Sequence, residues 1–338
     1  MGSHEEHTVT VVMDRRALMA GGATLLLVPW AAGAQARAKT ERIGYLQAAP
    51  RAALAHLIEA QLEGLRQLGW VEGQNLLIER RFADGKIERL PALAAELVRR
   101  DVRLIFTPSN QGVTAIQQAT RTLPVVMLAG NPVESGFIAS LPRPGGHVTG
   151  LTFDAGPELT GKRLELLREV VPSLSRVAFL TDTSFPGMAR SLKEVEEAGQ
   201  RLGIVARVFD VRRREDLEPA FAAVGQGGFG GIFVSGVPVV FGARAVVIGL
   251  AAKRRLPAIY NFREAAPAGG LMSYSVDFRD LFRRSAAYID RILRGATPGS
   301  LPVEQPMKFE LVVNLKAARA LGLTIPQSLL LRVDQVIE

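Results

Sequence analysis

The chain has 338 residues, with 41 Lys or Arg, 33 Asp or Glu, a formal net charge of +8 and no cysteine. The absence of cysteine excludes disulfides, thiolate metal sites, catalytic thiols and a lipid anchor attached to a cysteine. Basic residues are spread along the chain, with Arg212–Arg214 as the longest run, so we interpret the positive charge as solvated surface and expect no nucleic-acid partner.

The first predicted element is an export signal over residues 1–36. Arg15 and Arg16 precede about a dozen apolar residues, and small residues follow, in the order typical of a cleavable signal peptide. The apolar run is shorter than the roughly 20 residues of a membrane span, so we expect no stable membrane anchor. We expect cleavage near residues 34–36 and a periplasmic mature chain, exported by the general or the twin-arginine route.

From residue 42 onward, short β-type runs alternate with helical periods, which is the pattern of a parallel sheet covered by helices. In the first half the sequence predicts strands at 42–47, 76–82, 104–107 and 125–129, and helices at 54–68 and 87–99. The same order recurs: RIGYLQ from residue 42 corresponds to RVAFLTD from 176, and LIFTPS from 104 corresponds to GIFVSG from 231. Roughly 300 residues also exceed what one core usually serves. We therefore predict an α/β protein with two similar Rossmann-like lobes.

Ligands of open parallel sheets bind beyond the carboxyl ends of the strands, where helix N-termini and loop amides converge. Polar and aromatic residues follow or end several of the predicted strands. The candidate ligand-binding residues are Gln47, Ser109, Asn110, Asn131, Asp182, Ser235, Tyr260 and Tyr274. Two such rims facing each other would form a ligand cleft.

Each of these candidates also has a purely structural interpretation. Ser109 or Asn110 can cap the following helix, and the same helix start suits a carboxylate. Asp182 can pair with an ammonium group or serve as a turn residue. The rings of Tyr260 and Tyr274 can stack on a flat ligand or cover the core. The sequence leaves these alternatives open.

Catalytic motifs are missing from the sequence. After residue 37 the only histidines are His56 and His147, and no Gly-x-Ser-x-Gly, His-Glu-x-x-His or Walker loop occurs. The glycines at 225, 227 and 230 have the spacing of a dinucleotide fingerprint, but they precede the predicted strand at 232–234, so we interpret them as a helix-to-strand connection. We therefore expect a binding protein that is not an enzyme and has no metal or cofactor.

Four stretches carry a resemblance to a known family: SLPRPGGHVTGLT from residue 140, GKRLELLREVVPSLSRVAFL from 161, LPAIYNFREAAPAGGLMSY from 256 and VEQPMKFELVVNLKAARALGLTIPQSLL from 303. They resemble the ABC-transporter substrate-binding family that includes aromatic-amino-acid-binding proteins. The likeness runs from about residue 41 to the end. It implies the Venus-flytrap fold of type I periplasmic binding proteins, in which three crossings join two lobes around a ligand cleft.

The resemblance also implies domain boundaries and binding loops. The first lobe would comprise residues 37–151 plus about 276–305, and the second lobe 152–275 plus about 306–338. The ligand would be held by Ser109 and Asn110 and by the turn at 131–133. The family pattern places Asp where this chain has Asn131, which leaves open how the ligand's amino group would be recognised.

We therefore expect the periplasmic component of an ABC import system, monomeric, that passes an amino acid or a small aromatic or aliphatic carboxylate to the permease subunits. A sugar-binding protein of the same fold is one alternative, although Trp70, the only tryptophan of the mature chain, follows a helix away from the strand ends. A ligand-responsive transcriptional regulator is the other, although the export signal occupies the place of a DNA-binding domain.

Overall fold

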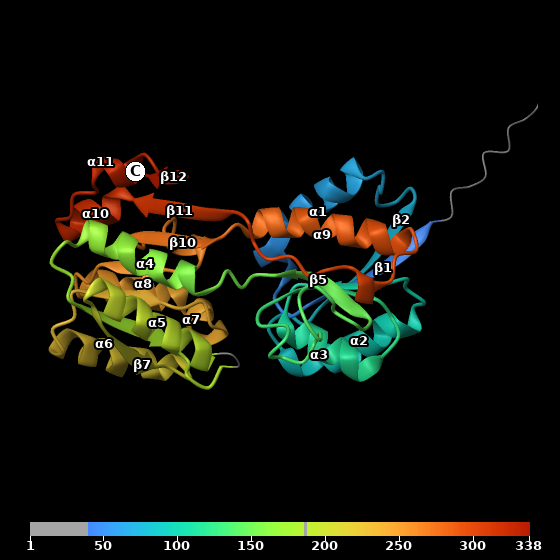
Figure 1. Ribbon diagram of the computed structural model, residues 1–338, viewed down its shortest axis with the longest axis horizontal. Helices are drawn as coiled ribbons and strands as arrows, with labels where there is room; N and C mark the ends of the chain where they lie inside the picture. The colour runs from blue at the N-terminus through green and yellow to red at the C-terminus, as the bar shows by residue number, and fades with distance from the viewer. Residues whose placement is uncertain (1–39, 186–187) are drawn as a thin grey trace, which may run out of the picture. The chain divides into compact units, whose positions relative to one another are not determined.

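The computed structural model describes residues 40–185 and 188–338 (Figure 1). The predicted export signal lies outside these residues. Within the described part of the chain, no helix combines the length and apolar character needed to cross a membrane.

The first sheet has five parallel strands in the order β2-β1-β3-β4-β5. The strands are β1 (Glu41–Gln47), β2 (Leu76–Phe82), β3 (Ile105–Thr107), β4 (Val125–Ala129) and β5 (Val148–Thr152). Its helices are α1 (Ala55–Gln67), α2 (Leu90–Arg99), α3 (Asn110–Ala119) and α9 (Phe278–Leu293). The strands predicted at 76–82 and 125–129 are confirmed to the residue. The predicted helix at 87–99 begins as a 3-10 turn, Ile87–Arg89, and becomes α-helical at Leu90, where Pro91 fits the first turn because its missing N–H is not needed there.

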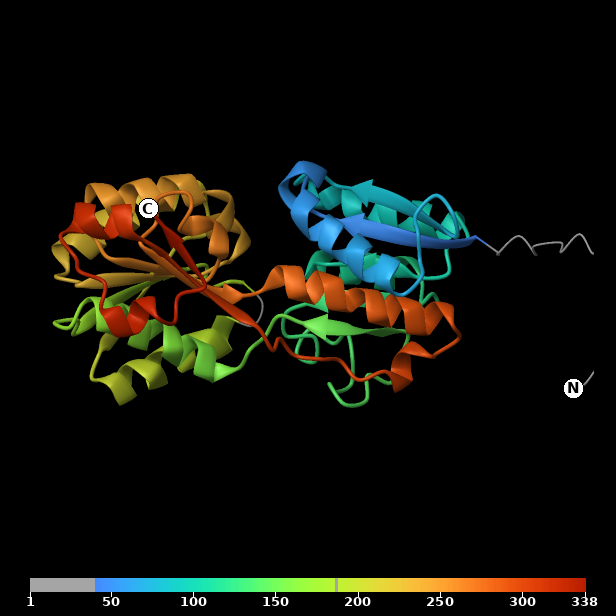
Figure 2. The same cartoon turned by 90° about the horizontal axis from the view of Figure 1, so that it is seen from above.

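Side chains of the first sheet alternate between two hydrophobic clusters, one on each face. Along β4, Val126 and Leu128 join the cluster formed with α1 and α9, whereas Val125 and Met127 join the cluster formed with α2 and α3. This alternation follows the two-residue period of a strand and explains why β4 is apolar throughout. Figure 2 shows α9 running alongside α1 over this sheet.

The second sheet has seven strands in the order β12-β11-β10-β9-β8-β6-β7. The strands are β6 (Arg176–Thr181), β7 (Val205–Asp210), β8 (Gly231–Val234), β9 (Ala258–Tyr260), β10 (Met272–Val276), β11 (Phe309–Asn314) and β12 (Gln335–Ile337). Its helices are α4 (Pro157–Val170), α5 (Met188–Leu202), α6 (Leu217–Gln226), α7 (Pro238–Gly242), α8 (Arg244–Lys253), α10 (Leu315–Leu321) and α11 (Gln327–Leu330).

The second sheet departs from the predicted all-parallel pattern at β11, which pairs with β10 in the antiparallel direction. The chain enters β11 after α9 and residues 298–304, which pack with the first sheet, and not through a crossover helix of the second sheet. It therefore returns to the second sheet from the end at which β10 leaves it. The interpretation of the glycines at 225–230 is confirmed, since α6 ends at Gln226 and β8 begins at Gly231.

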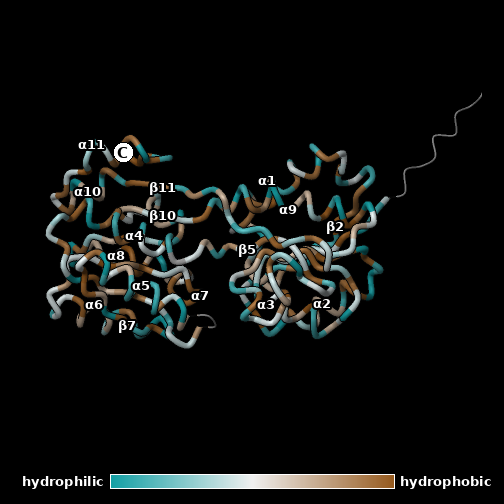
Figure 3. Tube along the Cα trace, in the orientation of Figure 1, coloured by the Kyte–Doolittle hydropathy of each residue, from teal (hydrophilic) through white to brown (hydrophobic). Residues whose placement is uncertain are grey.

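Both sheets thus have the predicted α/β architecture, a parallel core covered by amphipathic helices. Figure 3 shows the hydropathy changing between brown and teal within single helices, as expected for helices with one buried and one solvated face. Between the two sheets the chain passes at residues 153–156, at 277 and at 305–308.

Candidate functional site

The start of α3 lies directly after β3, at the carboxyl end of the first sheet. Ser109 caps this helix, and its Oγ accepts a hydrogen bond from the N–H of Gly112 at 3.1 Å, which confirms the predicted cap. A Cβ at position 112 would lie 1.9 Å from Oγ1 of Thr107, so the glycine lets the helix begin close against the strand. The first N–H groups of a helix have no intrahelical partners and carry the positive end of its dipole. This helix start can therefore hold a carboxylate.

Asn110 joins the start of α3 to the end of β4. Its Nδ2 donates to the carbonyl of Gly130 at 2.7 Å, and its Oδ1 accepts from the N–H of the same residue at 2.9 Å. The amide therefore satisfies both backbone groups of Gly130. Asn110 lies on the predicted rim, but its polar atoms hold the backbone together.

We call the two hydrogen bonds between Asn110 and Gly130 the clamp. Asn131 and Asp154 form a second polar group beside it. Asn131 has a φ of +46°, and its N–H donates to Oδ2 of Asp154. The hydroxyl of Thr152 donates to the same carboxylate oxygen at 3.1 Å. Burial raises the pKa of the half-buried Asp154 carboxyl above its ordinary value, although these two hydrogen bonds act in the opposite direction.

Asp154 is absent from the residues predicted from the sequence. It lies two positions after β5, so the rule that selected the other strand-end residues could have found it. Among the described residues, no basic side chain lies within ion-pair distance of its carboxylate.

Gln47 closes the loop that follows β1. Its Oε1 accepts hydrogen bonds from the N–H groups of Ala48 at 2.6 Å and Ala49 at 3.2 Å. The side chain is nearly buried. In this arrangement the Gln47 amide stabilises a turn at the rim.

Asp182 and Ser235 directly follow strands β6 and β8 of the second sheet. The Oδ1 atom of Asp182 accepts from the N–H of Ser184 at 2.8 Å and from its hydroxyl at 2.6 Å, which is the turn interpretation of this residue. Ser235 is buried and its hydroxyl donates to Oγ1 of Thr181 at 3.0 Å, so it joins the ends of β8 and β6.

The two predicted tyrosines have different surroundings. Tyr260 is completely buried, and its ring makes an edge contact with Phe262 at 5.5 Å between centroids. The structure therefore places Tyr260 in the core, where burial raises the pKa of its hydroxyl. Tyr274 is half-buried, packs against the hydrophobic clusters of both sheets, and lies 6.0 Å from the ring of Phe309.

Arg163 is a buried cation beside Tyr274 that the sequence analysis also missed. Its Nε donates to the carbonyl of Tyr274 at 2.8 Å, and its guanidinium lies 5.6 Å from the centroid of the Phe233 ring. Burial lowers the pKa of this guanidinium to about 9. Among the described residues no carboxylate lies within ion-pair distance of it, although the charge of Glu194 acts on it from farther away. The sequence pattern that could have indicated Arg163 is its spacing of three and four positions from Thr160 and Leu167, which places a basic residue on the buried face of α4.

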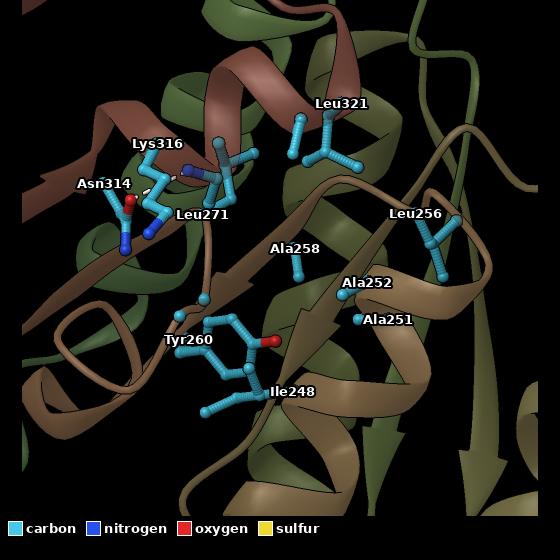
Figure 4. Close-up of a pocket in the computed structure, with 14 residues that line it drawn as sticks. Ile248, Ala251, Ala252, Leu256, Ala258, Tyr260, Leu271, Asn314, Lys316 and Leu321 are labelled. Carbon is cyan, nitrogen blue, oxygen red and sulfur yellow. Dashed lines mark hydrogen bonds between the residues drawn. The ribbon is translucent and has the colours of Figure 1, made fainter. Parts of the chain in front are cut away.

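A cavity of about 240 Å³ lies in the second lobe between α8 and α10 (Figure 4). Its lining is mostly apolar and includes Tyr260, the one predicted site residue that contributes to it. Ala258 and Leu271 place the cavity near the beginnings of β9 and β10, so it is distinct from the strand ends where ligands of such sheets bind.

Comparisons with known proteins give a consistent result. The family model for ABC transporter substrate binding proteins matches residues 43–337. A curated relative, the "Tyrosine-binding protein" of Clostridioides difficile (strain R20291), is 22% identical over 289 residues, which cover 84% of this chain and 82% of the relative.

Two solved structures have the same fold with a TM-score of 0.80 each. A conserved domain protein from Vibrio cholerae is 25% identical, and an ABC domain from Streptococcus pneumonia in complex with L-Trp is 24% identical. Each alignment covers 88% of this chain and 100% of the other.

Proposed function

Because the chain belongs to the ABC transporter substrate-binding protein family and has the type I periplasmic binding-protein fold, we propose that it serves an ABC import system in the periplasm. In this role it binds a small molecule without transforming it and delivers it to the permease subunits. We also propose that the export signal is removed near residues 34–36 and that the mature protein is a monomer without a nucleic-acid partner.

The proposed ligand is an amino acid or a small aromatic or aliphatic carboxylate. The observation that carries this proposal is the start of α3, where the positive end of the helix dipole and the capping hydroxyl of Ser109 lie directly after the carboxyl end of β3. The buried guanidinium of Arg163 adds positive charge on the second lobe, in favour of an anionic group. The names of two relatives support an aromatic side chain, since one is described as binding tyrosine and one is in complex with L-Trp.

We propose that the ligand binds between two lobes and that the closed arrangement binds it more tightly than the open one. The first lobe comprises residues 37–151 plus about 276–305, and the second 152–275 plus about 306–338. Three chain passages form the hinge in this proposal. A ligand shifts such an equilibrium only through its greater affinity for the closed state.

Isothermal titration calorimetry of residues 37–338 tests the ligand class. The titrants are L-tyrosine, L-tryptophan, 3-phenylpropionate, benzoate, glucose and arabinose. We expect binding of at least one carboxylate. In a separate thermal-unfolding experiment the same ligand should raise the free energy of unfolding by RT ln(1 + [L]/Kd), and with it the melting temperature. Binding of a sugar by a protein that ignores every carboxylate would overturn the assignment.

The variant Ser109→Ala tests the site. Loss of this hydroxyl is expected to weaken carboxylate binding by about 1 to 2 kcal/mol. The matched control is Thr114→Ala, because Thr114 is exposed on the same helix and, within residues 40–185 and 188–338, its hydroxyl donates only to the Asn110 carbonyl, at 3.1 Å. Equal affinity in Ser109→Ala and the unmodified protein would remove Ser109 from the site.

A further inference from the structure

We infer that the carboxylate of Asp154 binds the ammonium group of the ligand, so that the protein selects α-amino acids over the same acids without an amino group. This inference rests on the proposed function and narrows its ligand class. It also gives an answer to the question raised by Asn131, whose neutral amide brings no opposite charge to an ammonium group.

The first argument is the hydrogen bonding of the carboxylate. The Asp154 carboxylate accepts two hydrogen bonds, from the N–H of Asn131 and the hydroxyl of Thr152, and both are made to Oδ2. The Oδ1 atom accepts no hydrogen bond from the described residues. A carboxylate oxygen can accept two hydrogen bonds, so Oδ1 retains its capacity for a ligand donor.

The second argument is charge. Asp154 is half-buried, and a partly desolvated carboxylate is costly without a cation beside it. The positive charge of Arg190 lowers the pKa of Asp154 from a distance. However, the guanidinium of Arg190 forms ion pairs with Glu194 at 2.9 Å and with Glu134 at 3.6 Å, so its charge is shared with those carboxylates. Glu134 adds further negative charge near Asp154. The surroundings therefore favour a cation at Oδ1.

The third argument is position. A Cβ built on Gly130 would lie 3.4 Å from Oδ1 of Asp154, so this oxygen lies over the last residue before the Asn131 turn. The same glycine is bonded through its N–H and carbonyl to Asn110, the first residue of α3. The side chain of Asn110, the first residue of α3, and Oδ1 of Asp154 therefore both lie beside Gly130. An α-amino acid carries its ammonium and carboxylate groups on one carbon atom, so its two partners must come from neighbouring strand ends, as these do.

A structural role alone would also explain the hydrogen bonds to Oδ2 of Asp154, because the bond from the Asn131 N–H supports the left-handed backbone conformation of Asn131. The two roles are separated by the substitution Asp154→Asn. This variant keeps the shape and an acceptor for the Asn131 N–H but loses the negative charge. Its affinity for L-tyrosine is compared with that for 3-(4-hydroxyphenyl)propionate, which lacks only the amino group, by calorimetry at pH 7.

The unmodified protein is expected to prefer L-tyrosine over the analogue by about 30-fold, the low end of the cost of leaving a desolvated charged partner unpaired, because Asp154 is half-buried. In Asp154→Asn this ratio is expected to fall about tenfold or more, with the affinity for the analogue retained or increased. The matched control is Glu134→Gln, which removes a neighbouring carboxylate whose charge is already shared with Arg190, so it should lower the ratio by much less than Asp154→Asn does.

The outcomes separate the inference from the proposed function. A protein that binds neither compound nor any other carboxylate overturns both. A protein that binds both compounds equally, or an Asp154→Asn variant with an unchanged ratio, overturns the inference alone. A ratio that collapses in Glu134→Gln and persists in Asp154→Asn assigns the ammonium site to Glu134 and also overturns it.

Discussion

The clamp between Asn110 and Gly130 leads to a quantitative prediction about stability. Asn110→Ala removes the two hydrogen bonds to Gly130, of 2.7 and 2.9 Å, and a long one of 3.5 Å to Ser135, and it leaves the N–H and carbonyl of the buried glycine without these partners. At about 1 kcal/mol for each bond, plus part of the cost of the unpaired groups, the free energy of unfolding should fall by about 2 to 3 kcal/mol. For a lobe of this size the melting temperature should fall by about 4 to 12 °C, measured by circular dichroism.

Two further variants make this prediction specific. In Asn110→Asp, one carboxylate oxygen can still accept from the N–H of Gly130, but the other faces the carbonyl oxygen and cannot donate to it. The loss should therefore be at least as large as in Asn110→Ala. Thr114→Ala, one turn further along α3 on its exposed side, should change the free energy of unfolding by less than about 0.5 kcal/mol. If Asn110→Ala is as stable as Thr114→Ala, the clamp does not stabilise the lobe and the reasoning is refuted.

Three further predictions concern other parts of the chain. Gly150→Ala should destabilise the protein by more than about 3 kcal/mol, seen as loss of soluble protein or a large fall in melting temperature, because φ is +135° and the new Cβ would lie 2.1 Å from the carbonyl oxygen of Met127. Tyr288→Phe should cost about 1 kcal/mol in urea denaturation, because the hydroxyl donates to the Pro302 carbonyl at 2.6 Å; an unchanged midpoint would contradict this. Because burial raises the pKa of Asp154, its carboxylate becomes protonated, and loses its charge, at a higher pH than an ordinary aspartate. The affinity for L-tyrosine should therefore fall as the pH drops through this raised value. Asp154→Asn should abolish that pH dependence in calorimetry between pH 4 and 7.

The fold was largely predictable because its elements have strong local patterns. Strands such as β2 and β4 are short runs with clear ends, and β4, which is buried on both faces, is apolar throughout. The cap at Ser109 was predictable for a similar reason, since a serine between a strand and a helix has one dominant local partner. The direction of β11 was not predictable, because it depends on which end of the second sheet the chain re-enters after α9.

The candidate site was less predictable because polar side chains at strand ends can bind either a ligand or the backbone. For Asn110 the outcome is decided by Gly130, which lies 20 positions away in the sequence and becomes a neighbour only when β3 and β4 pair. The side chain of Tyr260 likewise becomes buried only when the helices cover β9. The two missed residues had weak signals in the sequence, a position just after β5 for Asp154 and the inward face of α4 for Arg163, but their lack of an ion-pair partner among the described residues is visible only in the structure.

The position of α9 has a consequence for the order in which the chain can fold. Leu57 and Leu65 of α1 are covered by Phe282 and Ile289 of α9, and these two helices are separated by more than half of the chain. During synthesis, the part of α1 that contacts α9 therefore stays uncovered until residue 293 has been made. The hydrophobic cluster between these two helices and the first sheet can be completed only after most of the second sheet has been synthesised.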